Sequence, residues 1–333
     1  MNGIELAEKY YKTYGENAFS SAFPEILPFL CFGLTGAGSE CYGFDDEISR
    51  DHDFEPGFCV FYPEDKLDSK QVFALERAYA KLPAEFMGFS RQKITSYGGV
   101  RRRGVIGVND FFSRYVPGGI APSDLSGWAT IPEQNLYEAL NGRIFVDNYG
   151  LFSAVRAALA DMPEDIKKKR LSGLLFALSQ SGWYNALRML GRGDTAASRL
   201  FLAEFARDAA RCVYILNDRY SPYVKWLFRG LKELPSDAVC SEIHQTIEKL
   251  LNIDLGRTGS RDELTACFKA VTEQILTGCE QKFGPGLFDS SSPPIGNENE
   301  TDRWIRLLQS AAFSLNDLVS DNYLRNSDIL LLV

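Results

Sequence analysis

The chain has 333 residues, of which 45% are hydrophobic and 24% charged, and its formal net charge is −8. This composition is typical of a globular protein and excludes collagen-like and disordered sequence, and the length suggests about two domains. Residues 1–60 hold 3 basic and 11 acidic side chains and therefore carry the whole net charge. Its sign is opposite to that of a non-specific nucleic-acid binder.

Histidine and cysteine usage narrows the chemistry further. The two histidines, His52 and His244, exclude a three-histidine zinc site by count. The seven cysteines form no Cys-x-x-Cys pair, so we expect reduced core residues of a cytosolic protein. No secretory signal is evident at the N-terminus, and no stretch reaches the roughly 18 apolar residues of a membrane span. We therefore expect a cytoplasmic protein without membrane partners.

Helices and strands alternate over the first half of the chain. In order, we expect a helical stretch over 4–30 with interruptions at Pro24 and Pro28, strands over 31–36 and 53–62, a helix over 68–80, a helix over 132–141, a strand over 143–147 and a helix over 151–160. The acid-free basic segment 91–103 is expected to be either a lid that closes on a triphosphate or on an acidic acceptor, or a solvated loop.

From Pro163 onward the periodicity becomes almost purely helical. The expected helical runs are 164–190, 195–219, 222–233, 237–252, 261–283 and 301–320. The fold class is therefore α+β, with a mixed-sheet domain over 1–160 and an all-α helical bundle over 161–333.

The most informative segment is 36–54, GAGSECYGFDDEISRDHDF. It places Gly38-Ser39 after one expected strand, and Asp51 and Asp53 at the start of the next. Side chains two apart on a strand point to the same side, so both carboxylates would converge on one point and hold a divalent cation. The N–H groups of a Gly-Ser turn can bind phosphate from the other side. This combination favours metal-assisted phosphoryl or nucleotidyl transfer.

This pattern resembles the nucleotidyltransferase superfamily that includes DNA polymerase β and the aminoglycoside nucleotidyltransferases, which shows Gly-Ser followed about ten residues later by Asp-x-Asp. Together with GRIFVDNYGLFSAVR and NDRYSPYVKW, the segment is most similar to the bacterial domain of unknown function 4037 family. The resemblance implies a nucleotidyltransferase-like N-terminal domain, a third metal-binding and catalytic carboxylate at Asp147, and phosphate binding by Lys225. It also implies Mg²⁺ or Mn²⁺ as cofactor and an NTP substrate, with ATP expected.

Each motif has a plainer interpretation. Gly-Ser and Asp-x-Asp are individually common, and Asp147 could simply begin an Asp-Asn turn. His52 is expected in the core, and Asp45, Asp46 and Glu47 in a solvated loop. Lys225 could lie on a solvated helix face, while the aromatic neighbours Tyr220, Tyr223 and Trp226 favour core packing. Glu204 and Asp208 are explained by local ion pairs with Arg207 and Arg211, although Glu204 or Asp194 could act as a base toward the acceptor.

The combined interpretation is a Mg²⁺-dependent nucleotidyltransferase that moves a nucleoside monophosphate from an NTP to a small-molecule or macromolecular acceptor. The alternative is a catalytically weak or inactive nucleotide-binding module of the kind found in toxin–antitoxin pairs. The sequence leaves open the acceptor, the base preference, the oligomeric state, and whether the general base is Asp147 or Glu204.

Overall fold

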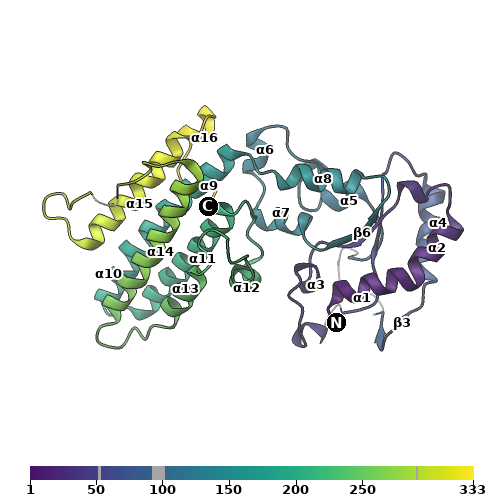
Figure 1. The fold of residues 1–333 in the computed structure, drawn as a ribbon, viewed down its shortest axis with the longest axis horizontal. Helices are drawn as coiled ribbons and strands as arrows, with labels where there is room; N and C mark the ends of the chain where they lie inside the picture. The colour runs from purple at the N-terminus through teal and green to yellow at the C-terminus, as the bar shows by residue number, and fades with distance from the viewer. Residues whose placement is uncertain (52–53, 92–101, 290–291) are drawn as a thin grey trace. The chain divides into compact units, whose positions relative to one another are not determined.

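The computed structural model describes residues 1–51, 54–91, 102–289 and 292–333, with the backbone alone at 50 and 51. The chain divides into two compact units (Figure 1). The first comprises 1–124 and 131–161, and the second comprises 125–130 and 162–333. The sequence analysis assigned 125–130 to the N-terminal domain, but this short segment packs with the helical unit.

The first unit is built on a four-stranded mixed sheet in the order β5-β2-β1-β6. The strands are β1 (Cys31–Leu34), β2 (Cys59–Tyr62), β5 (Gly104–Gly107) and β6 (Arg143–Asp147). β1 is antiparallel to both β2 and β6, whereas β2 is parallel to β5. A separate hairpin pairs β3 (Glu85–Phe86) with β4 (Phe89–Ser90). The mixed sheet predicted for this region is confirmed.

Two features of the sheet differ from the prediction. The second strand was expected over 53–62 but begins at Cys59, where pairing with Gly104 of β5 starts. Pro56 precedes it and lacks the N–H that a ladder needs. β5 was not predicted at all, because its four residues lie beside a basic segment without clear alternation.

Helices of the N-terminal segment cover one face of this sheet. α1 (Gly3–Tyr10), the π-helical turn η1 (Tyr11–Gly15) and α2 (Glu16–Ala22) follow one another, and η2 (Leu27–Phe29) precedes β1. Tyr11 packs on Phe32 of β1, with ring centroids 4.9 Å apart. At Gly15 a Cβ atom would approach the Phe58 ring to 2.6 Å, so this crossing requires glycine.

The remaining helices of the first unit connect or flank the strands. They are α3 (Ser39–Tyr42), η3 (Ile48–Asp51), α4 (Ser69–Ala80), α5 (Val108–Phe112), η4 (Pro117–Gly119), α7 (Glu133–Leu140) and α8 (Leu151–Ala160). α4 begins as predicted, because the Asp68 carboxylate accepts the N–H groups of Lys70 and Gln71 in a capping box.

The second unit is helical throughout its described elements, as predicted. It contains α6 (Leu125–Ala129), α9 (Glu164–Leu178), the π-helical η5 (Ser179–Ala186), α10 (Leu187–Gly191), α11 (Thr195–Leu216), η6 (Val224–Trp226), α12 (Leu227–Lys232), α13 (Ile243–Asn252), α14 (Ser260–Phe283), α15 (Glu300–Asp317) and α16 (Asn322–Asn326). The α+β fold class with a helical C-terminal region is thus confirmed.

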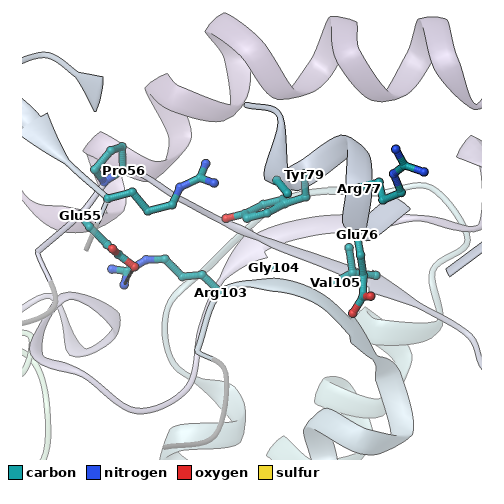
Figure 2. Close-up of a pocket in the computed structure, with 10 residues that line it drawn as sticks. Glu55, Pro56, Glu76, Arg77, Tyr79, Arg103, Gly104 and Val105 are labelled. Carbon is teal, nitrogen blue, oxygen red and sulfur yellow. Dashed lines mark hydrogen bonds and ion pairs between the residues drawn. The ribbon is translucent and has the colours of Figure 1, made fainter. Parts of the chain in front are cut away.

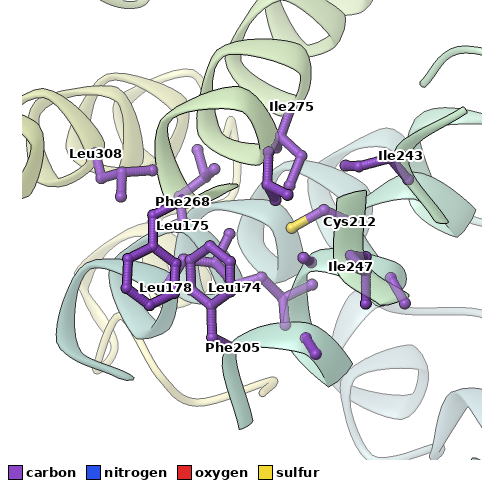
Figure 3. Close-up of a cluster of buried hydrophobic side chains, with 14 of the residues drawn as sticks. Leu174, Leu175, Leu178, Phe205, Cys212, Ile243, Ile247, Phe268, Ile275 and Leu308 are labelled. Atoms are coloured by element: carbon purple, nitrogen blue, oxygen red, sulfur yellow. The ribbon is translucent and has the colours of Figure 1, made fainter. Parts of the chain in front are cut away.

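Leucine, isoleucine and phenylalanine side chains from α9, α11, α13, α14 and α15 form one continuous core in this unit (Figure 3). Phe205 of α11 lies within it and is fully buried, and its ring contacts Phe268 of α14 at 4.6 Å between centroids. Gly182 lies so close to Phe205 that a Cβ there would approach the ring to 2.4 Å. The π-helical turn therefore packs directly on this aromatic pair.

All seven cysteines are free, and six are buried. Burial raises the pKa of the Cys41, Cys59 and Cys212 thiols above the ordinary value. Within the described ranges, no helix is long and apolar enough to cross a membrane.

Phe205→Ala is expected to lower the free energy of unfolding by about 3–5 kcal/mol, because it removes a fully buried ring and leaves a cavity. Chemical denaturation followed by far-UV circular dichroism measures this change. Leu200→Ala on the same helix removes a side chain that is 69% exposed and should change stability by less than about 0.5 kcal/mol. Equal effects of the two substitutions would contradict the core assignment.

Candidate functional site

The Gly36–Ser39 turn follows β1 directly and is held in an unusual backbone conformation. Gly36 and Gly38 have φ values of +104° and +123°, which favour glycine. The Asn141 side-chain amide ties the turn down, because its Oδ1 accepts the Gly36 N–H (2.9 Å) and its Nδ2 donates to the Gly36 carbonyl (2.8 Å). These hydrogen bonds therefore hold the turn in one position at the end of β1.

Only some of the backbone N–H groups of the turn are already hydrogen-bonded. Those of Gly36 and Ala37 donate to Asn141 Oδ1 and to the Tyr115 hydroxyl. Those of Gly38 and Ser39 find no acceptor among the described residues. Successive free N–H groups in a glycine turn make an anion-binding concavity, so the predicted Gly38-Ser39 pair keeps two donors available for a phosphate.

A buried ion-pair network borders the turn. The Glu40 carboxylate, whose residue is only 5% exposed, lies 2.9 Å from Arg102 Nη2 and 3.1 Å from Arg103 Nη2. Arg103 Nη1 also lies 3.4 Å from Glu55. Although burial acts to lower it, the neighbouring Glu40 and Glu55 carboxylates raise the pKa of Arg103, which stays charged. Two positive charges are thus fixed beside the free N–H groups.

Arg102 reaches the turn itself. Its Nη2 donates to the Ala37 carbonyl at 2.6 Å. A Cβ atom at Gly38 would lie 1.6 Å from Arg102 Nη2, so any other residue at Gly38 would displace this guanidinium. Part of the basic 91–103 segment is therefore neither a free lid nor a solvated loop, while residues 92–101 lie outside the described part of the chain.

The start of β2, which follows the acidic motif in the chain, lies beside the end of β1. Gly33 pairs with Cys59 in antiparallel register, so the end of β1 and the start of β2 lie together. Asp51 ends η3, eight residues before β2. The side chain of Asp51, together with His52 and Asp53, lies outside the described residues. The expectation that Asp51 and Asp53 share one side of a strand concerns these residues and stays a prediction.

Asp147 lies at the other end of the sheet. It pairs with Cys31, the first residue of β1, whereas the turn follows the last, Leu34. Its Oδ1 accepts the Gly150 N–H (3.0 Å) and its Oδ2 the Ser153 N–H (2.8 Å). Asp147 thus supports the start of α8, and it lies at the opposite end of β1 from the Gly38-Ser39 turn. These contacts are the ones expected if Asp147 simply begins an Asp-Asn turn.

The acids at 45–47 are not grouped into a metal site. Asp45 Oδ2 accepts the Gly3 N–H at 2.7 Å, and Asp46 Oδ1 accepts the Ser49 N–H at 3.0 Å. Glu47 is exposed. Within the described residues, no group of three or more His, Cys, Asp or Glu side chains is placed to hold a metal ion. Glu40 is already engaged by two arginines.

The residues of the YSPYVKW segment differ in their exposure to solvent. Lys225 is exposed and its Nζ lies 4.8 Å from the Trp226 ring centroid. Tyr220 is buried as expected, but Tyr223 is 45% exposed, so the core interpretation is wrong for it. The YSPYVKW segment has only a short 3-10 turn before α12, because Pro222 interrupts the helical pattern.

The local ion pairs predicted for the charged residues of α11 are found in part. Asp208 is buried and its Oδ1 lies 2.8 Å from Arg207 Nε and 3.8 Å from Arg211 Nη1. Glu204 is exposed, and Asp194 caps α11 by accepting the Ala197 N–H at 3.0 Å. Outside this helix, His244 Nδ1 contacts the Ser241 carbonyl at 3.0 Å.

Glu40, Glu55 and Asn141 were missed by sequence reasoning. Glu40 follows Ser39 directly, but nothing near it in the sequence indicates that its carboxylate pairs with two arginines. The only available signal was the Arg102-Arg103 pair, whose charges require compensation if buried. Asn141 gave no sequence signal, since it contacts the turn across 105 residues of chain.

Comparisons with known proteins identify one family segment. Residues 128–227 match the family model described as a domain of unknown function (DUF4037). The predicted resemblance to this family is thus confirmed over that segment. A crystal structure of a nucleotidyltransferase-like protein from Exiguobacterium sibiricum 255-15 is similar, with a TM-score of 0.34 and 12% sequence identity, covering 93% of this chain and 89% of that one. No curated protein matches the sequence significantly.

Glu40→Gln is expected to lower the free energy of unfolding by about 3–5 kcal/mol, because it removes the buried carboxylate that two arginines share. Urea denaturation provides the measurement. Glu47→Gln is the control, since Glu47 is exposed, and it should change stability by less than about 0.5 kcal/mol. Wild-type stability of the Glu40 variant would show that the network does not hold this edge together.

Proposed function

We propose that the first unit binds the phosphates of an NTP at the Gly38-Ser39 turn and that the protein is a Mg²⁺- or Mn²⁺-dependent nucleotidyltransferase. The observation that carries this proposal is the pair of unused N–H donors at Gly38 and Ser39, beside the fixed guanidinium of Arg102. Anions bind such backbone concavities, and arginine adds a charge-assisted donor. ATP is the expected nucleotide.

Asp51 and Asp53 would hold the divalent cation, because their segment leads into β2 at the edge where the turn lies. When bound, such an ion neutralises phosphate charge and orients the reacting groups. Asp147 is not included, since its carboxylate caps α8 at the other end of β1.

In the proposed reaction, an acceptor hydroxyl or amine attacks the α-phosphorus of the NTP. The new bond joins the acceptor oxygen or nitrogen to phosphorus, the bond to the bridging oxygen breaks, and pyrophosphate leaves. The acceptor's proton passes to a base. Glu204 is a candidate for that base, and Lys225 for a further phosphate contact, and both stay predictions. Cytoplasmic location and the acceptor class also stay predictions.

Asp51→Asn and Asp53→Asn are each expected to abolish Mg²⁺-dependent binding of a non-hydrolysable ATP analogue, because each removes a negatively charged oxygen ligand. Isothermal titration calorimetry with and without EDTA measures this binding. Glu47→Gln in the same loop is the matched control and should bind as the wild type does. Wild-type affinity in both aspartate variants would overturn the metal assignment.

Asp147→Ala separates a capping role from a metal role. The substitution removes the acceptor of the Gly150 and Ser153 N–H groups and should lower the free energy of unfolding by about 1 kcal/mol. Metal-dependent binding of the ATP analogue at 25 °C should be unchanged. Loss of binding from a fully folded Asp147 variant would instead restore Asp147 as a ligand.

The alternative function, a nucleotide-binding module without catalysis, has its own support. Arg102 occupies the space directly over Gly38 and is paired with Glu40. A triphosphate at the turn has to share or displace this guanidinium. Binding of ATP itself without pyrophosphate release in a screen of hydroxyl and amine acceptors, including aminoglycosides and lincosamides, would favour the module. Release with any acceptor would favour the enzyme.

A further inference from the structure

The first unit contains a pocket of about 360 Å³ that the proposed reaction does not use (Figure 2). It is lined by α4, the start of β5, the loop before β2 and Arg91. Its lining residues are Glu55, Pro56, Glu76, Arg77, Tyr79, Ala80, Arg91, Arg103, Gly104 and Val105. The volume lies within the range of about 300–1,000 Å³ that is typical of small-molecule sites.

Much of the pocket wall is apolar and rigid. In Figure 2 the Tyr79 ring lies between the Glu55 and Arg103 side chains on one side and those of Glu76 and Val105 on the other. The Tyr79 hydroxyl accepts the Phe58 N–H at 3.0 Å, which fixes the ring. Its ring also packs edge-on against Phe58, with centroids 5.3 Å apart. An apolar, flat ligand body would therefore meet a preformed surface.

Arg91 supplies the pocket with a positive charge that the described residues leave uncompensated. Its Nη2 donates to the Tyr10 hydroxyl at 2.6 Å, and its guanidinium carbon lies 5.1 Å from the Tyr79 ring centroid. No carboxylate of the described chain lies within ion-pair distance of it, and its buried Nε has no hydrogen-bond acceptor. Arg103 differs, because Glu40 and Glu55 neutralise it.

We propose that this pocket binds an aromatic organic anion. The phosphate or carboxylate of the ligand pairs with the half-buried Arg91 through charge-assisted hydrogen bonds. The ring of the ligand packs along Ala80 and Val105, and Glu76 accepts hydrogen bonds from amino groups on the ring. A nucleoside monophosphate carries all three features. The site is separate from the Gly38-Ser39 turn, although Arg103 contributes to both, and it requires no metal ion.

Calorimetry on the full-length protein in EDTA tests the proposal, with adenosine monophosphate, benzoate and inorganic phosphate as probes. EDTA separates this site from the metal-dependent binding proposed at the turn. Submillimolar binding of adenosine monophosphate identifies a phosphate headgroup, and binding of benzoate alone identifies a carboxylate. Inorganic phosphate should bind at least tenfold more weakly than the aromatic ligand, because it lacks the apolar body.

Two variants locate the binding. Arg91→Gln should weaken the aromatic anion at least tenfold, and Ala80→Trp, which fills the pocket from an exposed position, should do the same without touching Arg91. Arg192→Gln, an exposed arginine of the second unit, is the matched control and should bind normally. The proposal is overturned if neither aromatic anion binds, if phosphate binds equally well, or if folded Ala80→Trp retains wild-type affinity.

Discussion

The buried Glu40 carboxylate is the interaction on which the candidate site depends. It neutralises Arg102 and Arg103 at once, and these two residues lie next to each other at the start of β5. The same contact holds the guanidinium of Arg102 on the Ala37 carbonyl. One acidic side chain thereby joins the turn after β1 to the edge strand of the sheet. Without it, the two guanidinium groups would lose the carboxylate that they share.

The charge distribution of the sequence takes on a structural meaning through this network. The acidic excess of the first sixty residues is partly compensated by arginines that come some sixty residues later in the chain. Glu40 and Glu55 are the carboxylates that pair with these arginines. The free N–H groups of Gly38 and Ser39 lie beside this network, and Asp51 and Asp53 are the ligands proposed for a cation. The arrangement suits a nucleotide bound together with its metal ion.

The sequence allowed elements with strong local signals to be predicted well. α4 has a capping aspartate and α8 follows a glycine, and both begin where the pattern indicates. β5 could not be found, because four residues between basic and aromatic stretches acquire their strand conformation from pairing with β2. Asp147 was placed correctly on β6, yet its distance from the turn follows from strand register, which a single sequence does not specify. The Asn141 clamp and the Glu40 network likewise join residues that are remote in the chain.

The central claim is that the Gly38 and Ser39 N–H groups bind nucleotide phosphate. Amide nuclear magnetic resonance of the isotope-labelled protein during titration with Mg²⁺ and a non-hydrolysable ATP analogue tests it most directly. The account predicts saturable downfield shifts at Gly38 and Ser39, with smaller changes at Gly36 and Ala37, whose N–H groups are already bonded. Unchanged Gly38 and Ser39 resonances at a nucleotide concentration that saturates the protein would contradict it.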